Sequence, residues 1–132
     1  MAGLRILVVD DDRDLAAGTE LILRGMGHDV RVAHDGAEAL EIAAAFQPEA
    51  ALVDLGMPNM NGYLLARKLR EWRWTRDAVL IAVTGWGGER ERERAKEAGF
   101  DHHLLKPAQP ERIAELLAAV PPAPSAARDD NP

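Results

Sequence analysis

The chain has 132 residues, no cysteine and a formal net charge of −6, and this length fits a single domain with its own core. Without cysteine the fold uses neither disulfide bonds nor Cys-ligated zinc, and its acidic charge argues against direct nucleic-acid binding. The sequence contains no signal-peptide pattern and no run of the roughly 20 apolar residues of a membrane span, so we expect a cytoplasmic protein without membrane insertion.

Five short apolar runs alternate with amphipathic segments along the chain. The first, third and fourth runs are nearly continuous, as expected of central parallel strands that are covered on both faces. The second run alternates apolar and polar residues, which is typical of an edge strand. The predicted strands are residues 6–9, 30–33, 50–53, 79–83 and 103–105.

The segments between the strands have the periodicity of helices. The first helix is predicted to begin near Asp12 and to end at residues 25–27, and Gly99 is predicted to end the fourth. The apolar stripes are clearest in the third and fifth helices. Their members are Leu65, Leu69 and Trp72 in the third helix, and Ile113, Leu116, Leu117 and Val120 in the fifth.

This alternation predicts an α/β fold, with five helices covering both faces of a five-stranded parallel sheet. We expect a flavodoxin-like doubly wound domain over residues 1–120, with strand order 2-1-3-4-5. Ligands of such domains lie beyond the carboxyl ends of the strands, where the strand order reverses. Residues 121–132 are rich in proline and alanine and lack periodicity, so we expect a disordered tail or a cut linker.

Chemically useful side chains stand where four of the five predicted strands end. Residues 10–12 are aspartates, and Asp54, Thr84 and Lys106 follow the third, fourth and fifth strands. Close carboxylates repel one another, and a hard divalent cation such as Mg²⁺ removes that repulsion. A lysine and a hydroxyl beside them suit a phosphoryl group.

Each of these residues also has an ordinary structural interpretation. Asp12 and Asp14 are expected to cap or begin the first helix, because aspartate after a strand most often serves as a turn former or N-cap. Thr84 before Gly85 suits a turn, and Lys106 suits a solvated strand end. The ordered set, more than any member, indicates a site.

Four segments also carry a family pattern. Aspartates follow the first strand, Asp-x-x-Met-Pro-x-x-x-Gly occupies residues 54–62, Thr-Gly follows the fourth strand, and Lys106-Pro107 follows the fifth. Over roughly residues 4–120 the sequence resembles the receiver domains of two-component response regulators. Residues 84–87 and 100–103 look most like receivers of hybrid histidine kinases, and a stand-alone receiver is the other interpretation.

The resemblance implies that Asp54 accepts a phosphoryl group from a phosphohistidine of a histidine kinase or a histidine phosphotransfer protein. It also implies a Mg²⁺ (or Mn²⁺) ion ligated by Asp11 and Asp54, by Asp10 through water, and by the backbone carbonyl of Gly56. The domain would then be a signalling switch that catalyses its own phosphorylation and dephosphorylation, and not a turnover enzyme.

The resemblance assigns switching to the fourth and fifth strands. Thr84 and Lys106 would contact phosphoryl oxygens, and Pro107 is expected to follow a cis peptide bond. On phosphorylation Thr84 would move toward the new group, and in most relatives an aromatic residue three positions before the lysine then turns inward. His103 occupies that position, as a switch residue or as a half-exposed surface histidine.

Two further features bear on signalling. Gly56 and Trp86 lie two residues after Asp54 and Thr84, beside the path of attacking water, and we hypothesise that Trp86 mainly governs the lifetime of the phosphorylated state. Alternating charges at residues 89–94 are typical of a solvated helix face. The alternative is a partner surface on the fourth and fifth helices.

Two other functional classes stay open at this point. A haloacid-dehalogenase-like phosphohydrolase also combines an aspartate nucleophile, threonine, lysine and Mg²⁺, and there Asp10 would carry the phosphoryl group. Arg13 and Asp14 depart from the motif of that family. The other alternative is an interaction module of the receiver fold that takes no phosphate.

Overall fold

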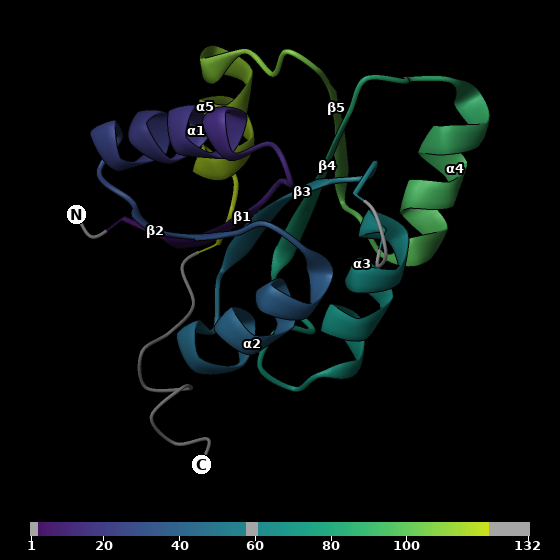
Figure 1. Cartoon of the computed structure of the whole chain (residues 1–132), viewed down its shortest axis with the longest axis horizontal. Coiled ribbons are helices and arrows are strands. Elements are labelled where there is room, and N and C mark those ends of the chain that lie inside the picture. Colours follow the sequence, from purple (N-terminus) through teal and green to yellow (C-terminus); the bar gives the residue numbers. More distant parts are fainter. Residues whose placement is uncertain (1–2, 58–60, 122–132) are drawn as a thin grey trace.

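The computed structural model describes residues 3–57 and 61–121. Five strands form one fully parallel sheet in the order β2-β1-β3-β4-β5, which confirms the predicted topology (Figure 1). The strands are β1 (Arg5–Val9), β2 (Asp29–Ala33), β3 (Ala50–Asp54), β4 (Val79–Thr84) and β5 (His102–Leu105).

Five helices cover the two faces of this sheet in two unequal layers. One core cluster joins the sheet to α1 and α5, and the other joins its opposite face to α2, α3 and α4. The helices are α1 (Arg13–Gly25), α2 (Gly36–Phe46), α3 (Gly62–Glu71), α4 (Glu89–Ala98) and α5 (Pro110–Ala118).

Strand β1 shows why the central runs are continuously apolar. Ile6 and Val8 pack in the cluster of α1 and α5, whereas Leu7 and Val9 pack in the cluster of α2, α3 and α4. Successive side chains of a strand point to opposite faces, so a strand covered on both sides needs an apolar residue at every position. The edge strand β2 alternates between exposed and buried positions instead.

Each strand is one residue longer than predicted. The extension matters most at Asp54 and Thr84, which are the last residues of β3 and β4 and not loop residues. In the sheet register Asp54 pairs with Val83, and Thr84 pairs with Leu105. The main chain of both polar residues is therefore fixed by the sheet.

The predicted helix boundaries hold for α1 and α4. The Asp12 carboxylate accepts hydrogen bonds from the backbone N–H groups of Asp14 and Leu15, which makes Asp12 the N-cap of α1. Gly99 ends α4 with φ of 114°, a left-handed conformation that favours glycine.

Two helices end before their apolar stripes do. Helix α3 ends one residue before Trp72, and α5 ends two residues before Val120. Trp72 takes an extended conformation and still packs against the core, and Val120 is buried in a closing turn. The stripes correctly predicted which side chains are buried, but not the helical ends.

The predictions for Pro58 of the family pattern and for residues 122–132 of the tail fall outside the described residues. Within residues 3–57 and 61–121, every helix is too short or too polar to cross a lipid bilayer.

Candidate functional site

The carboxyl ends of the parallel strands meet at one edge of the sheet. Strands β1 and β3 are neighbours there, although β2 lies between them in the chain, so the strand order reverses at this point. Asp10 follows β1, Asp54 and Thr84 end β3 and β4, and Lys106 follows β5. The topology thus places all four on the edge where ligands of such folds bind.

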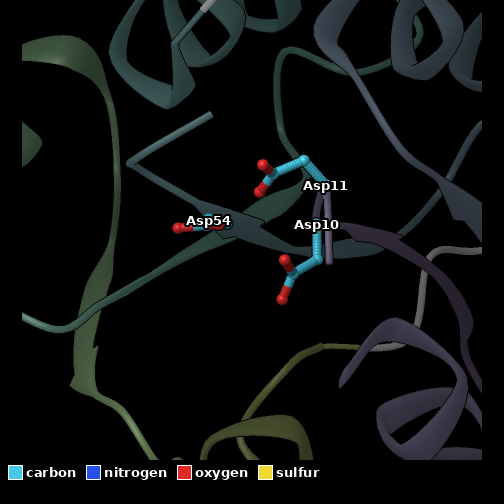
Figure 2. A group of neighbouring side chains, drawn as sticks. All are labelled: Asp10, Asp11 and Asp54. Carbon is cyan, nitrogen blue, oxygen red and sulfur yellow. The ribbon is translucent and has the colours of Figure 1, made fainter. Parts of the chain in front are cut away.

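Three carboxylates cluster at this edge. Asp10, Asp11 and Asp54 each offer an oxygen atom, and these atoms lie within 4.8 Å of one another (Figure 2). Asp54 is 7% exposed and Asp10 is 9% exposed, whereas Asp11 is open to solvent. This all-oxygen set, with one accessible member, fits a hard divalent cation such as Mg²⁺.

The electrostatics of Asp10 reflect this crowding. Burial is the main cause that raises the pKa of Asp10, and neighbouring Asp54 raises it further. Two contacts lower the pKa of Asp10 and so oppose these effects. The backbone N–H of Asp12 donates to Oδ1 of Asp10 at 3.0 Å, and Lys106 contributes its positive charge. A bound cation would remove the repulsion between these carboxylates.

The two oxygens of Asp54 have different partners. The backbone N–H of Gly56 donates to Oδ1 at 3.0 Å, and Nζ of Lys106 lies 3.3 Å from Oδ2. The same ammonium group lies 3.9 Å from Oδ2 of Asp10. Lys106 therefore faces two of the three carboxylates, and its peptide bond to Pro107 is cis.

Thr84 is joined to both neighbouring segments of the site. Its hydroxyl oxygen accepts a hydrogen bond from the backbone N–H of Trp86 at 3.1 Å, and its carbonyl accepts one from the N–H of Lys106 at 2.8 Å. The Thr84 side chain is buried. Because the hydroxyl accepts from Trp86, its own proton is available for donation to a ligand.

Gly62 explains the last position of the Asp-x-x-Met-Pro-x-x-x-Gly pattern. A Cβ atom at Gly62 would lie 2.8 Å from the carbonyl oxygen of Asp54 and 2.9 Å from Cα of Leu55. Both contacts are with the backbone, which cannot yield cheaply. The first residue of α3 must therefore be glycine for the helix to approach Asp54 this closely. By contrast, an added Cβ at Gly56 would meet only ordinary contact, 3.7 Å from Oδ1 of Asp54.

His34 is a residue of this edge that sequence reasoning missed. Its Nδ1 atom lies 3.2 Å from the carbonyl oxygen of Asp10. A carbonyl can only accept, so Nδ1 carries the proton in this contact. The backbone N–H of His34 donates to Oε1 of Glu38, and Asp35 caps α2. His34 directly follows β2, so the strand-end rule applied to all five strands would have included it.

Of the two remaining predicted residues, Trp86 lies after β4 and His103 lies near the start of β5. Trp86 is 67% exposed in the loop after β4. His103 is half-buried, and in the described part of the chain neither of its shielded ring nitrogens has a hydrogen-bond partner. Burial, and then the charge of Arg92, lowers the pKa of His103, while Glu91 raises it. His103 thus contacts neither Asp54 nor Lys106 through a hydrogen bond in this conformation.

The acidic edge is accessible from the side of α1. Asp10, Asp54 and Lys106 line a groove of about 420 Å³ together with apolar side chains of α1. Two of these, Leu15 and Ile22, are exposed. A partner molecule can therefore reach Asp54 along an apolar wall.

Sequence comparison identifies the family. Residues 6–118 match the family described as "Response regulator receiver domain". Response regulator MprA of Mycobacterium ulcerans is 38% identical over 115 residues, which are 87% of this chain and 47% of that protein. MprA of Mycobacterium avium is 37% identical, with 48% of its length covered. The chain thus spans about half the length of these curated relatives.

Solved structures agree with the fold and the site. Chemotaxis protein CheY4 of Vibrio cholerae superposes with a TM-score of 0.86 at 26% identity, over 91% of this chain and all of that one. The receiver domain of sensor histidine kinase PA1611 from Pseudomonas aeruginosa has a TM-score of 0.82 at 29% identity, over 90% of this chain and 98% of that one. The latter holds a magnesium ion in its active-site cleft. With its fold, its acidic edge and its family pattern, this chain belongs to the receiver domains of two-component response regulators.

Proposed function

We propose that Asp54 accepts a phosphoryl group from a phosphohistidine of a histidine kinase or a histidine phosphotransfer protein. The observation that carries the proposal is the surroundings of Asp54: one oxygen faces Lys106, the other accepts a hydrogen bond from Gly56, and Asp10 and Asp11 lie beside it. These contacts fix the orientation of the carboxylate at an accessible edge.

In this proposal Asp10, Asp11 and Asp54 hold Mg²⁺ or Mn²⁺, with the backbone carbonyl of Gly56 as a further ligand. The donor set consists of oxygens only, and a related receiver holds magnesium in its active-site cleft. When bound, the ion would offset negative charge on the carboxylates and on the transferring phosphoryl group.

The chain's own side chains would perform the transfer by position and charge. An oxygen of Asp54 forms the new bond to phosphorus while the bond from phosphorus to the imidazole nitrogen of the donor breaks. Lys106 offsets the charge that gathers on the phosphoryl oxygens, and the free hydroxyl proton of Thr84 donates to one of them. Water attack on the acyl phosphate at the same site then reverses the modification.

The lifetime of the phosphorylated state would depend on the access of water to Asp54. Gly56 has no side chain that could block water. The backbone N–H of Trp86 donates a hydrogen bond to the Thr84 hydroxyl, and the Trp86 ring is exposed. We propose that Trp86 shields the acyl phosphate. Trp86→Ala should then shorten its half-life, and an unchanged decay, followed by loss of phosphorylated mass, would refute this role.

The proposed output is a conformational switch. Phosphorylation adds close to two negative charges at Asp54, which would draw the Thr84 hydroxyl inward. Because the Thr84 hydroxyl is hydrogen-bonded to Trp86, the loop between β4 and α4 would follow this movement. His103 would turn inward in the same step. The surface of α4 and α5 would carry this change to a partner. We further propose a cytoplasmic location and a domain boundary near residue 120.

The alternatives make different predictions for the same edge. A phosphohydrolase would be phosphorylated at Asp10, and Arg13 and Asp14 depart from the motif of that family. An inert receiver-like module would take no phosphate, although the acidic cluster and Lys106 are present. The receiver family match favours neither alternative.

Intact-mass measurement tests the proposal. The chain is incubated with acetyl phosphate and Mg²⁺, and we expect the gain of one phosphoryl group in the wild type and none in Asp54→Asn. Asp77→Asn, an exposed aspartate outside the cluster, serves as the matched control and should gain the group. No gain in the wild type would favour the inert module.

A further inference from the structure

A second hollow lies at the opposite edge of the sheet. It is a groove of about 810 Å³ between α4, the start of β5 and the segment that leads into β4. Figure 1 shows α4 alongside β5. The lining residues 76–79 and 99–103 lie at the amino ends of β4 and β5, whereas Asp54 and Lys106 lie at the carboxyl ends. The groove is therefore separate from the proposed phosphorylation site.

Three cationic side chains converge on this groove from two segments. Arg76 comes from the connection between α3 and β4, and Arg92 and Lys96 come from α4. All three are exposed, and none forms an ion pair within the described part of the chain. Arg92 and Lys96 are four residues apart on one helix face, a spacing at which like charges destabilise the helix.

The acidic residues of the groove do not balance these cations. Asp101 is bound to Arg70, with 2.8 Å between Oδ2 and Nη2, and also accepts a hydrogen bond from the N–H of Leu80. Asp77 opposes the three cations with one charge. The groove thus holds an excess of two positive charges on a chain whose net charge is −6.

The groove takes up only part of the alternating charges of α4. Residues 89, 93 and 97 are glutamates at helical spacing, and they do not line the groove, whereas residues 92 and 96 do. Two cations of α4 therefore face the groove, while these glutamates lie outside it.

His103 adds an unsatisfied polar group to the same lining. Its two ring nitrogens have no hydrogen-bond partner in the described structure, and a polar group hidden in this way is costly. Burial and then the charge of Arg92 lower the pKa of His103, and the charge of Glu91 opposes them. A turn of the ring toward the groove would let an N–H donate to an anionic oxygen.

We propose that this groove binds a diphosphate group, either as free pyrophosphate or as part of a nucleotide. Arg92 and Lys96 would hold one phosphate, and Arg76 would hold the other. The cations stand on two walls of the groove, and a diphosphate offers one anionic group to each wall. Guanidinium groups match phosphate oxygens in paired hydrogen bonds. The excess positive charge is suited to such a ligand.

The size and the remaining lining suit a small molecule. The groove volume falls in the range of small-molecule sites, roughly 300–1,000 Å³. Val79 and the rings of His102 and His103 are half-buried and offer apolar and aromatic surface beside the cations. A nucleoside attached to the diphosphate would pack there.

Titration followed by ¹H–¹⁵N NMR tests the proposal in metal-free buffer, with pyrophosphate, ADP and uncharged adenosine as probes. We expect saturable shifts of the amides of residues 76–79 and 95–103 with pyrophosphate or ADP, and none with adenosine alone. Tighter binding of ADP identifies a nucleotide as the source of the diphosphate, and equal binding identifies the free diphosphate.

A matched pair of variants separates a site from general attraction. Arg92→Gln/Lys96→Gln should weaken binding roughly tenfold or more, which corresponds to about 1.4 kcal/mol. Arg67→Gln/Arg90→Gln removes the same charge from exposed positions outside the groove and should bind like the wild type. Arg76→Gln, on the other wall, should also weaken binding and does not alter α4.

Three results would overturn the proposal: no saturable shift in the groove, equal weakening in both double variants, or shifts confined to the surroundings of Thr84 and Lys106. None of them bears on phosphorylation of Asp54, which the intact-mass experiment measures independently.

Discussion

Nζ of Lys106 lies 3.3 Å from Oδ2 of Asp54, at the ends of two strands that are not neighbours in the sheet. Strand β4 separates β3 from β5, so the long lysine side chain crosses the position where Thr84 ends β4. The pair therefore encloses the place where a phosphoryl group on Asp54 would sit.

Replacing this lysine should slow phosphorylation. In Lys106→Met the charge that faces Asp54 is lost, and we expect a decrease of roughly 10²-fold in the rate with acetyl phosphate and Mg²⁺, as for loss of one stabilising donor. Lys68→Met on α3 is the control and should keep the wild-type rate. An unchanged rate in Lys106→Met, measured by intact mass against time, would exclude the proposed role of Lys106.

Gly62→Ala should destabilise the fold. The added methyl group would lie 2.8 Å from the carbonyl oxygen of Asp54, and overpacking of this kind costs about 1–3 kcal/mol. Gly18→Ala in α1 is the matched control, because its Cβ would meet nothing within 4 Å and alanine is favoured in a helix. Urea unfolding should show a lower free energy of unfolding for Gly62→Ala only. Equal stabilities would mean that α3 can shift away from β3 at little cost.

His34→Ala should weaken the binding of Mg²⁺ without abolishing it. The variant loses the hydrogen bond that holds the main chain of Asp10, which is worth about 1 kcal/mol to the fold, so we expect binding weakened by roughly fivefold at most. Asn can donate from a similar position and should restore part of the affinity. His102→Ala, at the far end of β5, should bind Mg²⁺ like the wild type. Affinity measured by NMR titration decides, and identical values for His34→Ala and the wild type would contradict the positioning role.

His28 should make stability depend on pH. Its Nδ1 atom accepts a hydrogen bond from the N–H of Leu4 at 3.0 Å, which requires that nitrogen to be unprotonated. Burial lowers the pKa of His28 from its ordinary value of 6.5, and Glu49 opposes this effect. Below pH 6.5 the unfolded chain binds a proton that the folded chain resists, so the free energy of unfolding should fall with pH until the lower folded-state pKa is reached.

The measurement for His28 is urea unfolding of the wild type and of His28→Gln at several pH values. The pKa of His103 is also lowered, but its contribution is common to both proteins and cancels in their difference. We expect the wild type to lose stability relative to the variant as the pH falls below 6.5. Parallel curves would show that His28 does not titrate differently on folding.

Much of the fold and the site was predictable because the signals are local. The apolar runs identified all five strands, and the strand order is that of the flavodoxin-like domain we expected. Asp54, Thr84 and Lys106 could be placed on one edge because parallel strands share the direction of their carboxyl ends. The structure confirms that placement, while the chemical roles of these residues remain proposals.

Other features depend on contacts between distant segments. The hydrogen bond from His34 to Asp10 and the closeness of Gly62 to Asp54 arise only when β2 and α3 pack beside β1 and β3. The early end of α3 follows from the extended conformation of Trp72, which helical periodicity does not encode. Arg76, which precedes β4, lines the basic groove together with residues of α4, and no spacing in the sequence predicts that these segments share a groove.

Site mapping of the phosphorylated chain tests the central claim most directly. After incubation with acetyl phosphate and Mg²⁺, borohydride reduces an aspartyl phosphate to homoserine, which tandem mass spectrometry locates in the sequence. We expect homoserine at residue 54 and at neither residue 10 nor residue 11. Homoserine at residue 10, or no homoserine in a chain shown to be folded, would contradict the account of Asp54 as the phosphoacceptor.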